Sequence, residues 1–322
     1  MPNLMLTNYC NYHCPYCFGM DMMAPKKERA LMSRDTFKGI IDWLERKPFD
    51  RVIHLMGGEP TLHPDIEWMI DYLLEHEMHI TIFSNMATKQ SVSLAEKLSV
   101  LPISWVANVN NPAKWNQTQR ENITRSLKAA GRRVSITFNI MPEEPNELWA
   151  LDLIEQYDLG RSIKVGFVLP TLTASNMALK DSEYDIVAQR VVDLVKAGEH
   201  LGITIEYECG VPYCVFTDEQ MGYLWRHRSN VNSGCSSRLD ITPEGEVMYC
   251  LPLATAGLRH YTTFDSYPEC RDWFEKRFLP YRMLGNKIEC AECPLNNPLK
   301  CNGACLAKNM IGAHNVQVTD AE

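Results

Sequence analysis

The chain has 322 residues and a net charge of −8, with 45% hydrophobic and 22% charged residues. This composition is typical of a globular protein with a buried core, and its acidic balance argues against a protein that binds the phosphate backbone of nucleic acids. No stretch approaches the roughly 18 uncharged apolar residues of a membrane span and the start lacks a secretory signal, so we expect a cytoplasmic protein whose twelve cysteines bind metal rather than form disulfides.

Short segments rich in β-branched or aromatic residues alternate along the chain with segments of helical periodicity. The predicted strands cover residues 3–7, 51–56, 79–84, 103–109, 133–140 and 162–169. The predicted helices cover residues 33–47, 64–77, 88–99, 113–130, 145–157 and 181–201, and the first two begin at Ser33 and Asp65. Six β-then-α units with short connections predict an α/β fold with a parallel sheet, curved into a partial (β/α)6 barrel of the TIM type.

The pattern changes after residue 205. Residues 239–250, LDITPEGEVMYC, predict two strands joined by a Pro-Glu-Gly turn, and a helix is expected near residues 267–284. A cysteine-rich segment follows. We therefore expect a barrel domain over residues 1–205 and a smaller cysteine-rich domain over residues 206–322.

Three cysteines lie directly after the first predicted strand. Cys10, Cys14 and Cys17 form the pattern C-x3-C-x2-C. In a parallel α/β barrel, catalytic groups lie where strands end, and cysteine thiolates hold iron–sulfur clusters. A cubane cluster with three protein thiolates leaves one iron for a small molecule. Buried structural cysteines and an incomplete zinc site are the alternatives.

A glycine pair ends the second predicted strand, in the sequence MGGEP from Met56 to Pro60. Gly57 and Gly58 allow a close backbone approach, and the amides, carbonyls and Glu59 carboxylate there would suit an amino-acid-like ligand with an ammonium group. A simple strand-to-helix turn has the same residues. The position one βα unit after the cysteines puts both motifs on one rim of the barrel.

Together these motifs resemble the radical S-adenosylmethionine (SAM) superfamily over residues 3 to 200. The resemblance implies a [4Fe-4S] cluster, with Cys10, Cys14 and Cys17 as ligands and catalytic residues, whose open iron binds SAM. It also implies that the reduced cluster cleaves SAM to a 5′-deoxyadenosyl radical, which abstracts hydrogen from a substrate. The SAM-binding residues that it implies are Tyr16, Gly57, Gly58, Glu59, Pro60, Ser84, Asn85, Val168 and Leu169.

Some of these assignments have alternatives. The family often has Asn-Gly where this chain has Asn85-Met86. Val168 and Leu169 would also suit the core of a strand. Further polar candidates near strand ends are Asn108, Asn110 and Asn139.

The later cysteines resemble the SPASM extension, which carries auxiliary iron–sulfur clusters. They form Cys235-x9-Gly245-x4-Cys250 and then Cys290-x2-Cys293-x7-Cys301-x3-Cys305. By pattern, Cys214, Cys235, Cys250 and Cys305 would hold one cluster. A second would be held by Cys290, Cys293 and Cys301, open or with a non-cysteine ligand.

Other partitions stay open. Cys209, in place of Cys214, is an alternative ligand of the first auxiliary cluster. Cys290, Cys293, Cys301 and Cys305 also suit a cluster of their own or a structural zinc site. Cys270 matches no position of the pattern, which suggests a core residue.

Auxiliary clusters usually accompany oxidative chemistry, so the leading hypothesis is oxidative modification of a ribosomally made peptide. A small-molecule enzyme acting on a sugar, aminocyclitol or cofactor precursor is the second, and a non-catalytic metal-binding scaffold the third. Leu251 replaces the aspartate of sulfatase-maturating relatives and disfavours that activity. Arg238 and Asp240 would handle substrate or protons, or belong to a solvated strand pair.

The partners that the resemblance implies are a flavodoxin or ferredoxin as electron donor and a peptide or small-molecule substrate. Because the first predicted strand begins at residue 3, a peptide-recognition module would be a separate protein. No nucleic acid or membrane partner is expected.

Overall fold

A computed structural model describes residues 1–143, 147–227, 229, 231–235, 238–297 and 300–312. Within these residues, ten strands form one sheet in the order β10-β9-β8-β1-β2-β3-β4-β5-β6-β7. The strands are β1 (Asn3–Met5), β2 (Val52–Met56), β3 (His79–Ser84), β4 (Ser104–Asn108), β5 (Val134–Ile140), β6 (Ser162–Phe167), β7 (Thr204–Tyr207), β8 (Asp240–Ile241), β9 (Glu246–Met248) and β10 (Arg259–His260).

Strands β1 to β7 are all parallel to their neighbours. The six predicted strands are therefore confirmed, whereas β7 was not predicted. The expected hairpin is also confirmed, because β8 and β9 pair antiparallel, and β8 adds to the sheet beside β1 with Asn3 opposite Asp240. The predicted domain boundary at residue 205 falls inside β7, and the division into two domains stays a prediction.

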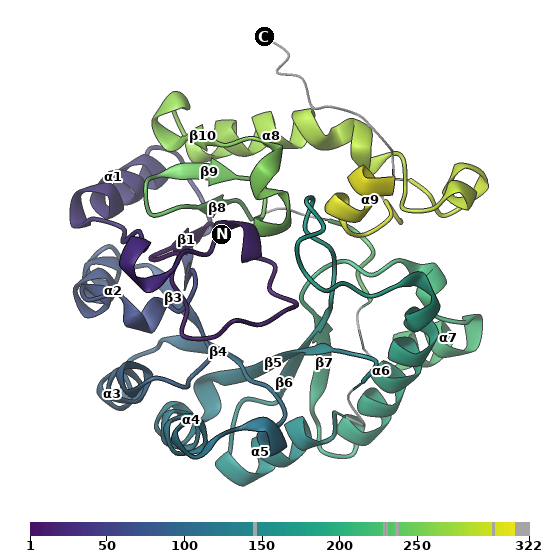
Figure 1. Cartoon of the computed structure of the whole chain (residues 1–322), viewed down its shortest axis with the longest axis horizontal. Helices are drawn as coiled ribbons and strands as arrows, with labels where there is room; N and C mark the ends of the chain where they lie inside the picture. The colour runs from purple at the N-terminus through teal and green to yellow at the C-terminus, as the bar shows by residue number, and fades with distance from the viewer. Residues whose placement is uncertain (144–146, 228, 230, 236–237, 298–299, 313–322) are drawn as a thin grey trace.

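The helices lie around the outside of this curved sheet, and the segment after β1 lies within the curve (Figure 1). The partial α/β barrel is thereby confirmed. The helices are α1 (Arg34–Glu45), α2 (Ile66–Glu75), α3 (Lys89–Lys97), α4 (Gln117–Ala130), α5 (Trp149–Tyr157), α6 (Tyr184–Glu199), α7 (Asp218–Arg226), α8 (Tyr267–Arg282) and α9 (Leu306–Gly312). The expected start of α5 at residue 145 lies outside the described residues.

Side-chain caps explain where several helices begin. The Ser33 side chain accepts a hydrogen bond from the Thr36 amide at the start of α1, as predicted. Thr88 and Ser91 form a reciprocal capping box at α3. The predicted start of α2 at Asp65 is also observed, but this carboxylate accepts from the Arg34 side chain instead of capping the helix.

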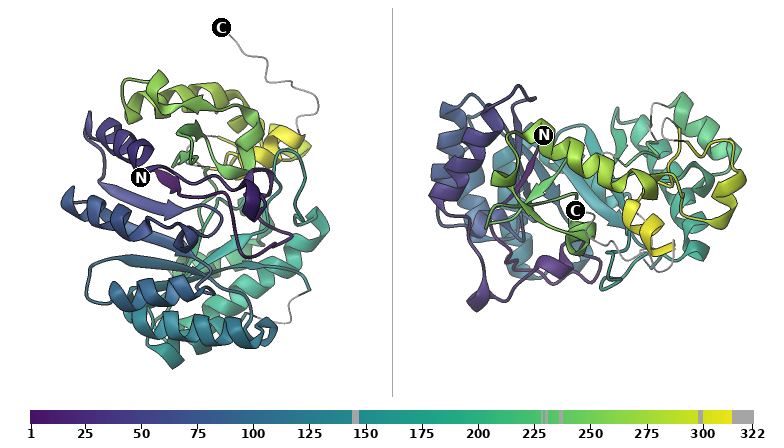
Figure 2. Two further views of the ribbon diagram at one scale, coloured as in Figure 1. Left: turned by 60° about the vertical axis from the view of Figure 1, so that its left-hand side comes forward. Right: turned by 90° about the horizontal axis from the view of Figure 1, so that it is seen from above.

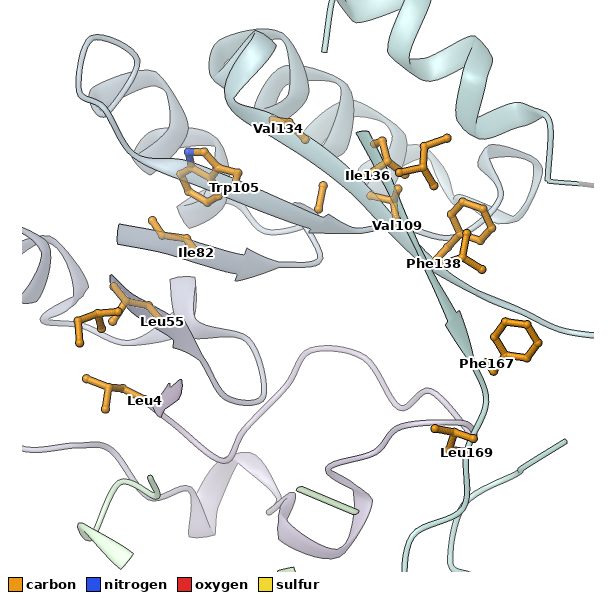
Figure 3. Packing of buried hydrophobic residues seen from close by; sticks show 14 of the residues in the cluster. Leu4, Leu55, Ile82, Trp105, Val109, Val134, Ile136, Phe138, Phe167 and Leu169 are labelled. Carbon is orange, nitrogen blue, oxygen red and sulfur yellow. The ribbon is translucent and has the colours of Figure 1, made fainter. Parts of the chain in front are cut away.

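The barrel core lies between the sheet and its helices. In β5, Val134, Ile136 and Phe138 point to this layer, whereas Thr137 and Asn139 lie on the opposite face of the strand, inside the curve. Figure 3 shows how the apolar residues of successive strands meet there. This alternation leaves polar side chains on the inner face of β5.

The C-terminal helix lies between the two ends of the sheet (Figures 1 and 2). In α9, Lys308 Nζ contacts the Asp181 carboxylate at 2.6 Å and the Tyr184 hydroxyl at 3.2 Å, at the start of α6. Asn309 Nδ2 donates to the Tyr281 carbonyl of α8 at 3.3 Å. In the described part of the chain, no helix is both long and apolar enough to cross a bilayer.

Candidate functional site

The three N-terminal cysteines lie on one loop after β1. The Cys17 amide donates to the Cys14 carbonyl at 3.1 Å, which forms a turn between these two cysteines. The pKa of the Cys10 thiol is raised to about 12, mainly by burial and in part by Glu59, Cys14 and Cys17, while the hydrogen bond from the Tyr12 amide opposes the shift. The structure therefore brings the three thiols into one neighbourhood at the carboxyl end of β1.

The glycine pair after β2 supports this loop directly. The Gly58 amide donates to the Thr7 carbonyl at 2.8 Å, and the Glu59 amide donates to the Tyr9 carbonyl at 2.9 Å. Gly57 has a φ of 142°, and a Cβ at Gly58 would lie 2.7 Å from the Cys10 nitrogen and closer still to the Tyr9 carbonyl. Both glycines are needed because the cysteine loop lies in backbone contact with them.

Glu59 is almost fully buried, with 1% of its surface exposed. Its Oε1 accepts from the Thr61 amide and hydroxyl and from the Ser84 hydroxyl, and its Oε2 accepts from the Asn85 amide at 2.8 Å. Burial raises the pKa of this carboxyl, and those hydrogen bonds oppose the shift. The carboxylate thus joins the ends of β2 and β3, and a direct contact of Glu59 with SAM stays a prediction. Pro60 is buried at the start of the short helix beside it.

Glu59→Gln is expected to lower the thermal midpoint by about 2–6 °C, which corresponds to about 1–3 kcal/mol. The amide NH2 would face a donor from Asn85 or Thr61, leaving a buried donor unpaired. Differential scanning calorimetry of the reconstituted protein measures the effect. Glu67→Gln, which alters an exposed ion pair with Lys97, is the matched control, and equal midpoints for the two variants would contradict this prediction.

Asn85 connects β3 to the cysteine loop. Its Nδ2 lies 2.8 Å from Asn11 Oδ1 and 3.8 Å from Cys10 Sγ, and its Oδ1 accepts from the Ala87 amide. Met86 has a φ of 58°, a left-handed conformation that glycine adopts without strain. Met86 is also fully buried in the core, so packing compensates for the backbone strain.

A hollow of about 330 Å³ lies beside Tyr16. The Tyr16 hydroxyl donates to Asn110 Oδ1 at 2.6 Å, which makes Asn110 one of the predicted candidates that the structure brings to the cysteine loop. Burial raises the pKa of the Tyr16 hydroxyl. The hollow is lined by residues of the cysteine loop, of the segment between β4 and α4 and of the start of α4: Asn11, Tyr12, His13, Cys14, Pro15, Tyr16, Asn110, Lys114, Trp115 and Gln119.

Val168 and Leu169 follow β6 and belong to the barrel core, with 1% and 3% of their surface exposed. Their carbonyls accept from the Leu179 amide and from Asn176 Nδ2. These contacts give both residues a structural task, and their contact with adenine stays a prediction. Asn108 is exposed at the end of β4.

The donor set at the N-terminal loop fits an iron–sulfur cluster. Its three thiols lie together, and Cys10 Sγ accepts an N–H from Tyr12 at 3.4 Å and lies near Asn85 Nδ2, donors that stabilise a thiolate. Among the described residues, no three His, Cys, Asp or Glu side chains meet closely enough to hold a single metal ion. A cubane takes its thiolates on separate iron atoms, so they do not need to meet at one point.

The family model of the radical SAM superfamily matches residues 4–158. The chain contains a radical SAM domain. Curated relatives include a GTP 3′,8-cyclase from Ectopseudomonas mendocina, 24% identical over 77% of this chain and 78% of that protein. The radical SAM cyclopropyl synthase TigE from Paramaledivibacter caminithermalis is 21% identical over 94% of this chain and 67% of that protein.

The same fold occurs in a solved structure, Streptococcus suis SuiB bound to the precursor peptide SuiA. It superposes with a TM-score of 0.65 over 95% of this chain and 71% of that chain, at 13% sequence identity. Beyond the radical SAM domain, the SPASM assignment of the later cysteines stays a prediction.

Outside the radical SAM domain, the structure gathers the later thiols into two groups. The pKa of the Cys250 thiol is raised well above its usual range by burial and then by Cys235, Asp240, Cys305 and Cys209. The pKa of Cys214 is raised by burial and then by Cys301 and Cys290, while Lys287 lowers it. Cys214 thus lies near Cys301 and Cys290, and its predicted grouping with Cys235, Cys250 and Cys305 stays a prediction. Cys270 is buried in α8, as expected.

Asp240 is buried and accepts from Asn3 Nδ2 at 2.6 Å and from the Leu251 amide at 2.7 Å. Burial raises the pKa of this carboxyl to about 6. The expected alternative of a solvated strand pair is therefore wrong for Asp240, which joins β8 to β1. Arg238 is exposed.

Glu208, directly after β7, is a candidate that was not predicted from the sequence. Its Oε1 accepts from the Thr137 hydroxyl at 2.6 Å, and burial raises the pKa of the Glu208 carboxyl. Asn139 Oδ1 is buried and has no hydrogen-bond partner among the described residues, and a Cβ at Gly166 would lie 2.2 Å from it and 3.5 Å from Glu208 Oε2. A polar residue directly after a strand is a signal for a site residue, but this signal could not be used because the strand β7 itself was not predicted.

Proposed function

We propose that this protein is a radical SAM enzyme that oxidatively modifies a ribosomally made peptide. The observation that carries the proposal is the position of three thiols at the carboxyl end of β1, where Gly58 and Asn85 contact the cysteine loop. When bound, the cluster and SAM supply the radical that abstracts a hydrogen atom from the substrate. The similarity to the radical SAM cyclopropyl synthase TigE supports a radical reaction. SuiB, which has the same fold, was crystallised with a precursor peptide.

The residues of the chain hold and orient these groups. Cys10, Cys14 and Cys17 would ligate the cluster, and Asn85 would donate an N–H to the Cys10 sulfur. Tyr16 lines the hollow in which we place the adenine end of SAM. A flavodoxin or ferredoxin would supply the electron, and a separate protein would present the peptide.

The polar inner face of β5 to β7 is the proposed substrate surface. Thr137, Asn139 and Glu208 lie there on the rim that also carries the cysteine loop. Because Asn139 Oδ1 has no hydrogen-bond partner within the described residues, a substrate N–H or O–H would satisfy it. A peptide amide offers such a donor.

A small-molecule substrate is the second candidate. The similarity to a GTP 3′,8-cyclase, which extends over 77% of this chain, favours it. The two candidates are separated by incubating the anaerobically reconstituted enzyme with SAM, dithionite and either short peptides encoded beside its gene or a panel of nucleotides and sugars. Mass spectrometry of the products decides, and the peptide proposal fails if only a small molecule is changed.

Cys235→Ala is expected to stop product formation while 5′-deoxyadenosine is still made. An oxidative product requires a second electron to leave the substrate, and the auxiliary cluster is the proposed acceptor. Product and 5′-deoxyadenosine are quantified from the same reaction. Circular dichroism must first show a folded protein, because cluster loss also destabilises small metal domains. Full product from folded Cys235→Ala would show that the reaction needs no such acceptor.

A further inference from the structure

Three polar side chains meet near the carboxyl ends of β5 and β7, the two neighbours of β6. The Thr137 hydroxyl of β5 donates to Glu208 Oε1 at 2.6 Å. Asn139, two residues further along β5, lies opposite Gly166 of β6. Asn139 Oδ1 and Glu208 Oε2 both lie within 3.5 Å of the point where a Cβ of Gly166 would be. The glycine therefore lets two oxygen acceptors approach each other across the middle strand.

Neither acceptor has the partner that would satisfy it. Asn139 Oδ1 is buried and accepts no hydrogen bond from any residue that the structure describes. Over the same described ranges, the Glu208 carboxylate forms no ion pair with a basic side chain. Lys164 of β6 lies opposite Glu206 instead. An unpaired charge beside an unpaired oxygen costs folding free energy, which a bound donor would recover.

These acceptors lie at the end of the barrel that carries the cysteine loop. The Tyr16 hydroxyl of that loop donates to Asn110 Oδ1 at 2.6 Å. The neighbouring Val109 amide donates to the Thr137 carbonyl at 3.1 Å, and the Thr137 side chain donates to Glu208. Successive contacts thus connect the hollow beside Tyr16 to the carboxylate. A group bound to Glu208 would face the same end of the barrel as the proposed SAM site.

We infer that Asn139 and Glu208 bind a positively charged group of the substrate, an ammonium or a guanidinium. Such a group supplies the charge that Glu208 lacks and a second N–H for Asn139 Oδ1. Both residues are partly exposed as a whole, so a group that enters the barrel can reach them, and the Asn139 amide can turn toward it. The inference rests on the proposed function in one respect, that the inner face of β5 to β7 is the substrate surface. In a peptide it selects a lysine or arginine side chain.

Butylguanidinium chloride and neutral butylurea are matched probes, since they differ in charge but hardly in shape. Saturation-transfer NMR with the anaerobically reconstituted protein should detect butylguanidinium and not butylurea. Glu208→Gln should weaken butylguanidinium binding about 10–100-fold, the usual loss for a hydrogen bond to a charged group. Glu206→Gln, which removes an exposed carboxylate from β7, should leave binding unchanged. Equal signals from the two probes, or equal binding to wild type and Glu208→Gln, would overturn the inference.

The stability of the free protein gives a second readout, which separates substrate binding from a structural role. Asn139→Leu keeps the approximate size of the side chain but removes the unpaired oxygen, and Glu208→Gln removes an unpaired charge. The thermal midpoint of each variant should therefore equal that of wild type or exceed it, while probe binding falls. A lower midpoint for Asn139→Leu would show that this side chain holds the strands together, and would overturn its assignment to substrate.

Replacing the charged group of the substrate completes the test. With a precursor peptide, norleucine in place of lysine or citrulline in place of arginine should raise KM about 10–100-fold. Glu208→Gln should then cause little further loss with the neutral peptide, because the two changes remove the same interaction. A full additional loss would contradict the inference. The proposed function fails separately if no 5′-deoxyadenosine is made, because probe binding requires no turnover.

Discussion

Cys14→Ala is expected to lower 5′-deoxyadenosine formation at least about 100-fold while leaving auxiliary iron bound. Loss of an outer hydrogen-bond partner of a metal ligand already costs 10–100-fold, so loss of the ligand itself should cost more. The Cys14 carbonyl accepts from the Cys17 amide, and because alanine retains this carbonyl, the loop conformation should survive. Anaerobic assays with dithionite and chromatography of the nucleoside products measure the effect.

Cys270→Ala is the matched control for this experiment, because it removes a buried thiol from α8 far along the chain from the cysteine loop. It should cleave SAM at the wild-type rate, with some loss of stability from the smaller side chain. Wild-type SAM cleavage by Cys14→Ala would show that the N-terminal loop does not hold the radical cluster.

Gly58→Ala is expected to have an effect of similar size on SAM cleavage through geometry alone. The new methyl would collide with the Tyr9 carbonyl and the Cys10 amide, both of them backbone groups of the cysteine loop. A shift of about 1 Å in a catalytic group costs about 100-fold in rate. The thermal midpoint should also fall, because the hydrogen bonds from Gly58 and Glu59 to that loop would lengthen.

Gly222→Ala provides the comparison. This glycine lies inside α7, and the nearest atom to a new Cβ is the flexible Arg226 guanidinium at 3.4 Å. Alanine there should stabilise the helix by about 0.5–1 kcal/mol and leave SAM cleavage unchanged. Gly58→Ala with normal activity and an unchanged midpoint would mean that the loop can move away from β2 at little cost.

Most of the barrel could be predicted because its strands are apolar on the side that faces the helices. Strand β5 is typical, with Val134, Ile136 and Phe138 buried in alternation. Strand β7 could not be found in this way, since it is a short edge strand, and Thr204 and Glu206 are exposed. Missing β7 also meant missing Glu208, whose position is meaningful only at the end of a strand.

The cysteine spacing predicted the first site better than the later ones. Cys10, Cys14 and Cys17 lie within one loop, so their order in the sequence determines their proximity. The later thiols come from separate loops after β7, before β8, after β9 and before α9. Which of them meet depends on backbone contacts such as that of Gly210 with Gly234, and no spacing rule contains this information.

The position of α9 links the iron content of the protein to the stability of its fold. Strands β7 and β10 are the two edges of the described sheet. Helix α9 connects the two sides, because Lys308 contacts the start of α6 and Asn309 contacts α8. Helix α9 begins one residue after Cys305, a proposed cluster ligand. A chain that lacks iron should therefore keep its parallel strands but lose the contacts of α9 with α6 and α8, and a protease should cut there first. Metal supply would then set the lifetime of the protein as well as its activity.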